Sequence, residues 1–218
     1  MAIGYLQTAG SATDLTTYTF SSQNLGEAAF DRTIICAVSG RTQDGTSSGN
    51  VISSVTIGGV SATIAVQGQN SGNTQGIAIA SVPTGTTGDV VVVFAETMTN
   101  AEVSLYRCTG ISTTVYDSGT STASVGTYDL DIPANGVAVA MMKNDDGSQT
   151  ATWAGLVETY DEQDTTGNDI SGSAAEFSTT QTNLTVSCTW SGTPTRPIYA
   201  TASFSPASSV NSGFFMFM

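Results

Sequence analysis

Hydrophobic and polar residues alternate with a period of two along much of this chain, which is the pattern of half-buried β-strands. Residues 18–20 and 128–132 show it most clearly, with apolar side chains on one parity and threonine or aspartate on the other. Residues 89–95 are instead apolar at nearly every position, which is typical of a central strand covered on both faces. The hydrophobic pattern therefore predicts a protein made of strands.

Turn signals separate these runs at short intervals. Gly58-Gly59 lies between two strand-like arms and predicts a tight hairpin. Residues 25–30 are the one place where the sequence permits a short helix, and the Ser/Thr/Gly-rich residues 118–126 predict either a long loop or a crossing between sheets. The remaining strand candidates are residues 33–38, 54–57, 60–66, 76–82, 101–108, 115–116, 136–142, 152–160, 174–179, 184–190 and 198–204.

The spacing of about 11–13 strands with turns between them is expected of an all-β fold. We expect an antiparallel β-sandwich, jelly-roll-like, with little or no helix. Residues 1–206 are expected to form a single domain, because no composition shift within them demands a boundary. Residues 207–218 are expected to be a flexible segment that ends in an apolar anchor.

The composition supports an all-β fold and excludes several classes of function. Serine and threonine make up more than a quarter of the chain, whereas charged residues make up 11%. Lys plus Arg is 5 and Asp plus Glu is 18, for a net charge of −13, so no basic surface for nucleic acid is expected. There is no histidine, so neither a histidine-based catalytic set nor an imidazole metal ligand exists. We expect no enzyme and no cofactor.

The cysteines and the N-terminal sequence bear on the compartment. Cys36, Cys108 and Cys188 each lie in an apolar run, which favours buried free thiols, although a disulfide between two of them stays open. The first residues lack the charged and apolar stretches of a signal peptide, and no run is long enough to span a membrane. We expect synthesis in a cytoplasm and no membrane partner.

Several motifs have a functional and a structural interpretation. The acidic side chains of Asp145, Asp146, Asp161 and Asp164 offer oxygen ligands for calcium, but their spacing does not fit a calcium loop, so solvated turns are the simpler interpretation. No metal is therefore expected. Residues 45–49 match the G-x-S-x-G pattern, yet a Gly/Ser loop without a histidine base does not suit a nucleophile.

Paired carboxylates and aromatic residues give two further candidates. Asp129 and Asp131 project to one face of a strand, which suits a solvated face better than a pair of glycosidase acids across a cleft. Trp153 and Trp190 each lie in a predicted strand, and two interpretations stay open. They either pack in the core or stack against a glycan from an exposed sheet face.

The chain ends in an uninterrupted run of aromatic and methionine residues. Such a run would favour aggregation if it were left in water, so it is expected to be buried. It either forms a last strand on its own sheet or docks on a partner, where methionine adapts to irregular gaps. The partner-binding candidates are Phe214, Phe215, Met216, Phe217 and Met218.

The order of strands and turns resembles β-sandwich structural proteins of tailed bacteriophages. The likeness is carried by short segments at residues 18–20, 25–26, 32–35, 54–59, 82–85, 89–92, 105–106 and 200–204, with Ala62. It spans most of residues 16–206 and concerns architecture. What it implies is a virion component of the capsid decoration, head fibre or tail accessory type, without catalytic residues.

We therefore expect a non-enzymatic virion structural protein on the particle exterior, on the head rather than the tail. Its expected partners are phage shell or tail proteins and further copies of itself as a homo-oligomer. A hydroxyl-rich surface with net negative charge suits a repeated exterior subunit, because it resists adhesion to DNA. The alternative is a carbohydrate-binding β-sandwich module that contacts a host surface glycan.

Overall fold

The computed structural model describes residues 3–42 and 50–208, and these residues form sixteen β-strands and no helix. All paired strands run antiparallel. The prediction of an antiparallel all-β sandwich is confirmed, while the strand count exceeds the expected 11–13 and a jelly-roll order stays a prediction. The strands are β1 (Ile3–Ser11), β2 (Leu15–Asn24), β3 (Arg32–Thr42), β4 (Ile52–Ile57), β5 (Val60–Ser61), β6 (Thr63–Asn70), β7 (Asn73–Ser81), β8 (Thr87–Thr109), β9 (Ile111–Ser121), β10 (Val125–Ile132), β11 (Gly136–Asn144), β12 (Ala151–Ala154), β13 (Val157–Gln163), β14 (Asp169–Phe177), β15 (Gln181–Trp190) and β16 (Ile198–Pro206).

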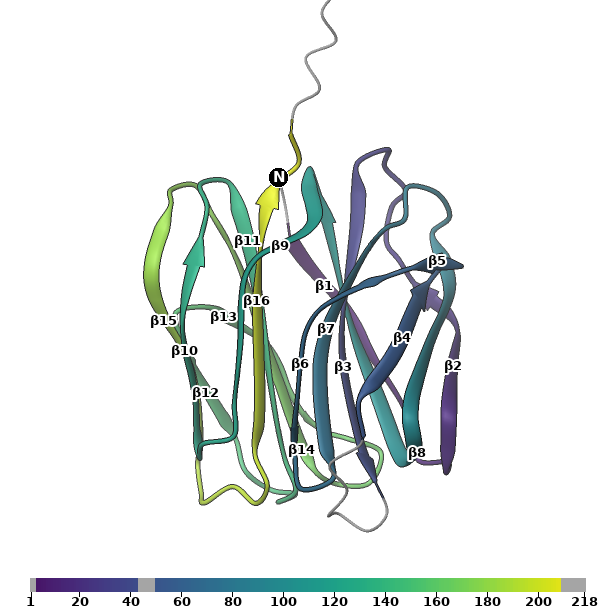
Figure 1. Ribbon diagram of the computed structural model, residues 1–218, viewed down its shortest axis with the longest axis vertical. Coiled ribbons are helices and arrows are strands. Elements are labelled where there is room, and N and C mark those ends of the chain that lie inside the picture. Colours follow the sequence, from purple (N-terminus) through teal and green to yellow (C-terminus); the bar gives the residue numbers. More distant parts are fainter. Residues whose placement is uncertain (1–2, 43–49, 209–218) are drawn as a thin grey trace, which may run out of the picture.

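The strands form four layers, although they belong to three hydrogen-bonded sheets (Figure 1). The long strand β8 connects two layers, because its first half pairs with β2 and β4 and its second half pairs with β1 and β3. We call β2, β4, β5 and the first half of β8 the first outer layer. The first inner layer holds β1, β3, β6, β7 and the second half of β8. The second inner layer is β13-β14-β11-β16-β9, and the second outer layer is β10-β15-β12.

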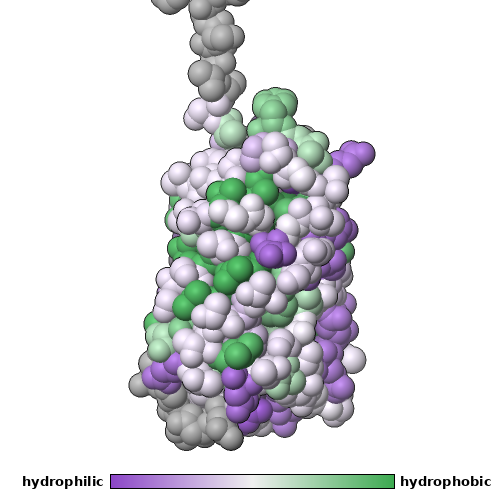
Figure 2. All heavy atoms as spheres, turned by 90° about the vertical axis from the view of Figure 1, so that its right-hand side faces the viewer, coloured by the Kyte–Doolittle hydropathy of each residue, from purple (hydrophilic) through white to green (hydrophobic). Residues whose placement is uncertain are grey.

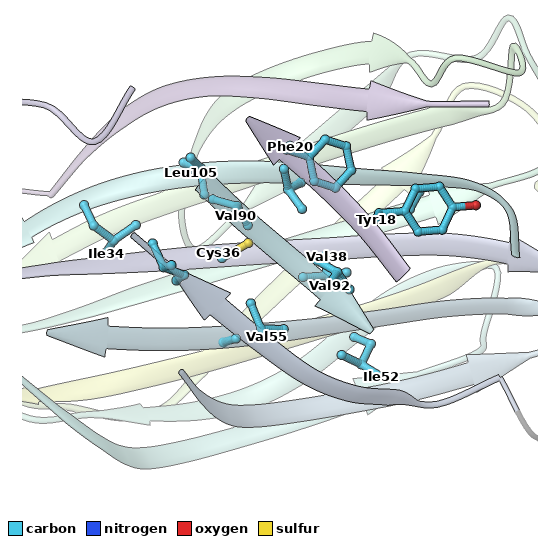
Figure 3. Close-up of a cluster of buried hydrophobic side chains, with 14 of the residues drawn as sticks. Tyr18, Phe20, Ile34, Cys36, Val38, Ile52, Val55, Val90, Val92 and Leu105 are labelled. Atoms are coloured by element: carbon cyan, nitrogen blue, oxygen red, sulfur yellow. The ribbon is translucent and has the colours of Figure 1, made fainter. Parts of the chain in front are cut away.

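Three hydrophobic cores separate the four layers. The first core fills the space between the first outer and first inner layers, with Tyr18, Phe20 and Val92 among its members (Figure 3). The second core joins the two inner layers and includes Ile35 and Phe204. The third core lies between the second inner and second outer layers. Each half of the chain thus builds one sandwich, and the second core joins the sandwiches back to back.

The central strands of the inner layers, such as β3, β7 and β11, are buried on both faces. In β3, for example, Ile34 faces the first core while its neighbour Ile35 faces the second. In β11, Val139 faces the second core and Ala140 the third. Because such strands have no solvent side, their sequences are continuous runs of apolar and small residues rather than alternating ones. This explains why residues 33–38, 76–82 and 136–142 are apolar or small at nearly every position.

Several strand boundaries differ from those predicted. Residues 89–95 and 101–108 are parts of the single strand β8, because the same segment continues from one layer into the next. Residues 118–126 contain a crossing between sheets, one of the two predicted alternatives, and not a long loop, since β9 pairs with β16 up to Ser121 and β10 begins at Val125 in another sheet. Residues 152–160 are two strands, β12 and β13, separated at Gly155, whose φ of 85° breaks the extended backbone.

The N-terminal strand and the predicted hairpin also show that pairing with other strands determines where a strand forms and ends. Strand β1 was not expected, and it forms by pairing with the second half of β8. The Gly58-Gly59 hairpin is confirmed, with both glycines at positive φ between β4 and β5. The second arm of the hairpin, β5, is shorter than predicted. It pairs with β4 only at Val60 and Ser61, and the residues that follow form β6, which pairs with β7.

Residues 25–30, where the sequence permits a short helix, form a loop. The guanidinium of the buried Arg32 donates to the carbonyl oxygens of Leu25 at 3.1 Å and Gly26 at 2.8 Å. It also donates to Val82 at 2.6 Å and Thr84 at 2.7 Å. Gly26 has a positive φ of 69°, which does not occur in a right-handed helix, and its carbonyl group points toward Arg32. Arg32 therefore holds this loop against the loop that follows β7.

Replacement of Gly172 by alanine should test how tightly the inner layers pack. A Cβ atom there would collide with the Tyr160 ring and lie 2.8 Å from the Tyr106 hydroxyl oxygen. Overpacking of this kind is expected to lower the free energy of unfolding by about 1–3 kcal/mol, measured by urea denaturation. Gly4→Ala is the matched control, because nothing lies within 4 Å of its added Cβ. Equal stability of the two variants would contradict tight packing in the second core.

Candidate functional site

A buried ionic cluster lies at one end of the interface between the two inner layers. It consists of Glu102 on β8, Lys143 on β11 and Asp164 in the loop between β13 and β14. Glu102 shares its strand face with Tyr106, and Lys143 shares its face with Met141, both of which belong to the second core. Strand alternation therefore directs the acidic and the basic side chain into the same interface.

Lys143 is the chain's only lysine, and its side chain is fully buried. Its Nζ donates to Oδ2 of Asp164 at 2.6 Å and lies 3.8 Å from Oε2 of Glu102. The Asp164 side chain is also fully buried, and that of Glu102 is 3% exposed. One cation therefore faces two carboxylates away from water, which is an arrangement that is costly to bury unless the polar atoms are satisfied.

Asp164 accepts hydrogen bonds on both carboxylate oxygens. Oδ1 accepts from the backbone N–H and hydroxyl of Thr166, both at 2.8 Å, and from the backbone N–H of Asn168 at 3.0 Å. Oδ2 accepts from Nδ2 of Asn100 at 2.8 Å and from Nδ2 of Asn168 at 3.1 Å, besides Lys143. Desolvation raises the pKa of Asp164, but Lys143 and these hydrogen bonds outweigh it, so the pKa lies below its usual range.

Glu102 has the opposite electrostatic character. Desolvation raises its pKa above the ordinary value, and the attraction of Lys143 only partly offsets this effect. Its Oε2 accepts from the Ser39 hydroxyl at 3.1 Å, and its Oε1 accepts from the Thr165 hydroxyl at 3.0 Å. The two carboxyl groups beside Lys143 thus differ in proton affinity, a feature that is common where buried side chains exchange protons.

A second group of charges lies next to this cluster. Asp145, whose side chain is 3% exposed, lies 2.7 Å from Nε of Arg196 and 3.7 Å from Nε of Arg41. It also accepts a hydrogen bond from Nδ2 of Asn73 at 3.0 Å. Asn73 and Arg41 belong to the first inner layer, so Asp145 connects the two sandwiches through polar contacts.

The four acidic residues considered for calcium are not gathered around a common point. Asp145 and Asp164 are engaged by the cations described above. Asp146 accepts from Thr195 at 2.9 Å, and Asp161 accepts from the backbone N–H of Ala151 at 3.0 Å. Over residues 3–42 and 50–208, no group of three or more histidine, cysteine, aspartate or glutamate side chains is placed to hold a metal ion.

The two tryptophans occupy different environments. Trp190 is 4% exposed and belongs to the third core, which is the core interpretation left open by the sequence. Trp153 is half-buried, its indole N–H donates to the Ser171 hydroxyl at 2.8 Å, and its ring lies 6.1 Å from that of Tyr199. Neither ring presents a broad open face. Glycan stacking by these residues is not favoured by their placement.

An acidic hollow with exposed aromatic surface lies elsewhere, at β9 and β10. Its volume is about 460 Å³, and the Tyr116 side chain at its rim is 52% exposed. Asp129 and Asp131 line it, while Leu130 between them is buried, as the strand alternation predicted. The carboxylates also serve the fold, because Asp131 accepts from the backbone N–H of Asn183 at 2.7 Å.

The three cysteines are free and buried, which confirms the free-thiol interpretation over a disulfide. Burial raises the pKa of each thiol, and that of Cys108 reaches about 12. Such thiols are inert at neutral pH. Residues 45–49 and the candidates Phe214, Phe215, Met216, Phe217 and Met218 lie outside the described residues. Within the described part of the chain, no helix has the length and apolar character needed to cross a membrane.

The sequence analysis did not identify the buried ionic cluster. A signal was present, because Lys143 ends the apolar run of residues 136–142 and Glu102 lies between the apolar Ala101 and Val103. Charged residues within runs that predict burial on both faces need partners. Only the stacking of the two inner layers, which belong to different sheets, brings these two side chains together.

No family model, curated protein or solved structure matches this chain.

Replacement of Asp145 by asparagine should weaken the polar connection between the sandwiches. The neutral amide keeps the shape but loses the charge that faces Arg41 and Arg196, so the free energy of unfolding should fall by about 1–3 kcal/mol. Asp146→Asn is the matched control, since that side chain accepts hydrogen bonds near the surface and should cost less than about 0.5 kcal/mol. Guanidinium denaturation measures both, and equal losses would contradict the connection.

Proposed function

We propose that this protein is a non-enzymatic structural subunit on the exterior of a tailed-phage particle, as a capsid decoration or head fibre protein rather than a tail accessory subunit. It acts by packing against shell or tail proteins and against further copies of itself. Its synthesis takes place in the host cytoplasm. The resemblance of its strand and turn order to phage β-sandwich proteins is the origin of this proposal.

The observation that carries the proposal is the four-layer stack with hydroxyl-rich outer sheet faces. In the first outer layer, Thr17 and Thr19 are exposed on β2, and the half-buried Val91 and Val93 lie beside them on β8. Figure 2 shows hydrophobic and near-neutral side chains side by side on one face of the molecule. Short, stiff side chains of this kind lose little rotamer entropy when two subunits pack. A flat sheet face of threonine and valine therefore suits a repeated lattice contact.

Quantitative peptide mass spectrometry on density-purified particles from the source tests this function. A fixed, simple ratio of this chain to the major shell protein is expected for a decoration subunit. A few copies per particle would indicate a fibre, neck or tip component instead. Complete absence from particles would overturn the virion proposal.

Deletion of residues 214–218 tests how the subunit is anchored. The C-terminal Phe/Met run is proposed to dock on a partner, so the deletion should abolish incorporation into particles while circular dichroism and the melting temperature stay unchanged. The exposed Phe30, 92% exposed, provides the control. Phe30→Ser removes a surface aromatic residue elsewhere and should leave incorporation intact. Unfolding of the truncated chain would show that the run belongs to its own core.

A glycan-binding module is the second candidate, favoured by the acidic hollow at β9 and β10. The exposed Tyr116 ring offers an apolar face for a sugar, and the carboxylates of Asp129 and Asp131 are acceptors for hydroxyl groups. Addition of saccharide should then change the intrinsic fluorescence of the wild type and of Trp153→Phe, but not that of Tyr116→Ala. Saccharide binding that persists in Tyr116→Ala would show that the hollow is not the glycan-binding site.

A further inference from the structure

The buried ionic cluster places a primary amine against a carboxyl group in a site without water access. Nζ of Lys143 lies 2.6 Å from Oδ2 of Asp164, and both side chains are fully buried. Chemistry between an amine and a carboxyl group requires that the two be held in contact and kept from solvent. Such fixed proximity replaces a bimolecular encounter and removes a large part of the barrier.

The surroundings of Asp164 differ between its two oxygens in a way that suits attack on its carboxyl carbon. Oδ1 points at two backbone N–H groups and one hydroxyl group, from Thr166 and Asn168. Donors fixed around one oxygen stabilise the negative charge that develops there in a tetrahedral intermediate. Oδ2 accepts from Lys143 and from the side-chain amides of Asn100 and Asn168, and as the oxygen nearest the amine it is the one placed to leave.

Glu102 supplies the third group that such a reaction needs. Its Oε2 lies 3.8 Å from Nζ of Lys143, a distance that the side chain can shorten during reaction. Because burial raises its pKa, it holds a proton more readily than an exposed glutamate does. It can therefore give a proton to a leaving group and take one from the amine.

We propose that Lys143 and Asp164 condense spontaneously in the folded protein to form an intramolecular isopeptide bond, with Glu102 as the proton carrier. The bond would covalently join β11 to the loop between β13 and β14, across the end of the second inner layer. It would make this end of the stack resistant to local opening.

The reaction balances without an oxidant or a co-reactant. The Lys143 ammonium passes a proton to Oδ2 of Asp164, which gives a neutral amine and a neutral acid. The nitrogen lone pair then forms a bond to Cγ, and the carbonyl electrons move to Oδ1. The protonated Glu102 donates its proton to the Oδ2 hydroxyl, which leaves as water while Oδ1 regains its double bond. The nitrogen finally returns a proton to Glu102, leaving an amide.

The exclusion of water from the cluster favours the amide once it has formed, although the starting ion pair is itself stable. The ion pair of Lys143 and Asp164 is strongly stabilised by hydrogen bonds, and it is the ground state from which the reaction starts. The low pKa of Asp164 makes its protonation by Lys143 the uphill step, and the fixed contact between Nζ and Oδ2 is what allows that proton transfer to occur. The same exclusion of water disfavours hydrolysis of the amide once it has formed.

Intact-protein mass spectrometry of the purified full chain, denatured after folding, decides the proposal. The expected mass is lower than the mass calculated from the sequence by one water molecule. Digestion should give a branched peptide that joins the segments containing Lys143 and Asp164. A loss of one ammonia would instead mean that Asn100 or Asn168, which both contact Asp164, is the acceptor, and would overturn the assignment to Asp164.

Two variants complete the experiment. Lys143→Arg keeps the positive charge but lacks the amine nucleophile, so it should show its full calculated mass. Glu102→Gln keeps the shape of the side chain but cannot carry the proton, so the bond should form far more slowly over days of incubation. A wild-type chain that retains its full mass would overturn the proposal. If the bond forms as fast in Glu102→Gln as in the wild type, Glu102 is not the proton carrier.

Discussion

Burial of two sheets on both faces is the constraint on which the rest of this structure depends. A sheet that packs on one side only leaves alternate residues to water, but the central strands of the two inner layers here have no free face. Their strands must therefore fit side chains into two cores at once, within a sheet spacing of about 10 Å. This requirement explains why alanine, serine and glycine recur among the apolar residues of β11, β14 and β16.

The hydroxyl groups in these strands follow from the same constraint. A buried hydroxyl is costly without a hydrogen-bond partner, and two hydroxyl groups of β16 donate to backbone carbonyl oxygens. Thr201 donates to the carbonyl of Val139 at 3.1 Å, and Ser203 donates to that of Asp131 at 2.6 Å. Threonine and serine can therefore serve as core residues in this fold, which is one reason why the chain carries so many of them.

Burial on both faces has chemical consequences at the end of the interface between the two inner layers, where the ionic cluster lies. Glu102, Lys143 and Asp164 lie in strands and a loop that a hydrophobic core covers on one side and polar side chains on the other. Because water does not reach them, they must satisfy one another. This forces a short contact between the amine and the carboxyl group, and it raises the proton affinity of Glu102 while lowering that of Asp164. The fold's packing thus creates the chemical environment of the cluster.

The sequence by itself determined the fold class, the positions of most strands and the Gly58-Gly59 hairpin, because alternation and turn chemistry are local properties. It also determined that Leu130 is buried between two aspartates. Tertiary structure alone decided that β8 runs through two layers, that Arg32 holds residues 25–26 in a loop, and that β1 forms a strand. The same is true of the ionic cluster, whose members are separated by up to 62 positions, 164 − 102, in the sequence. Contacts between distant strands depend on the register of the sheets and the stacking of the layers, and neither is encoded in a local pattern.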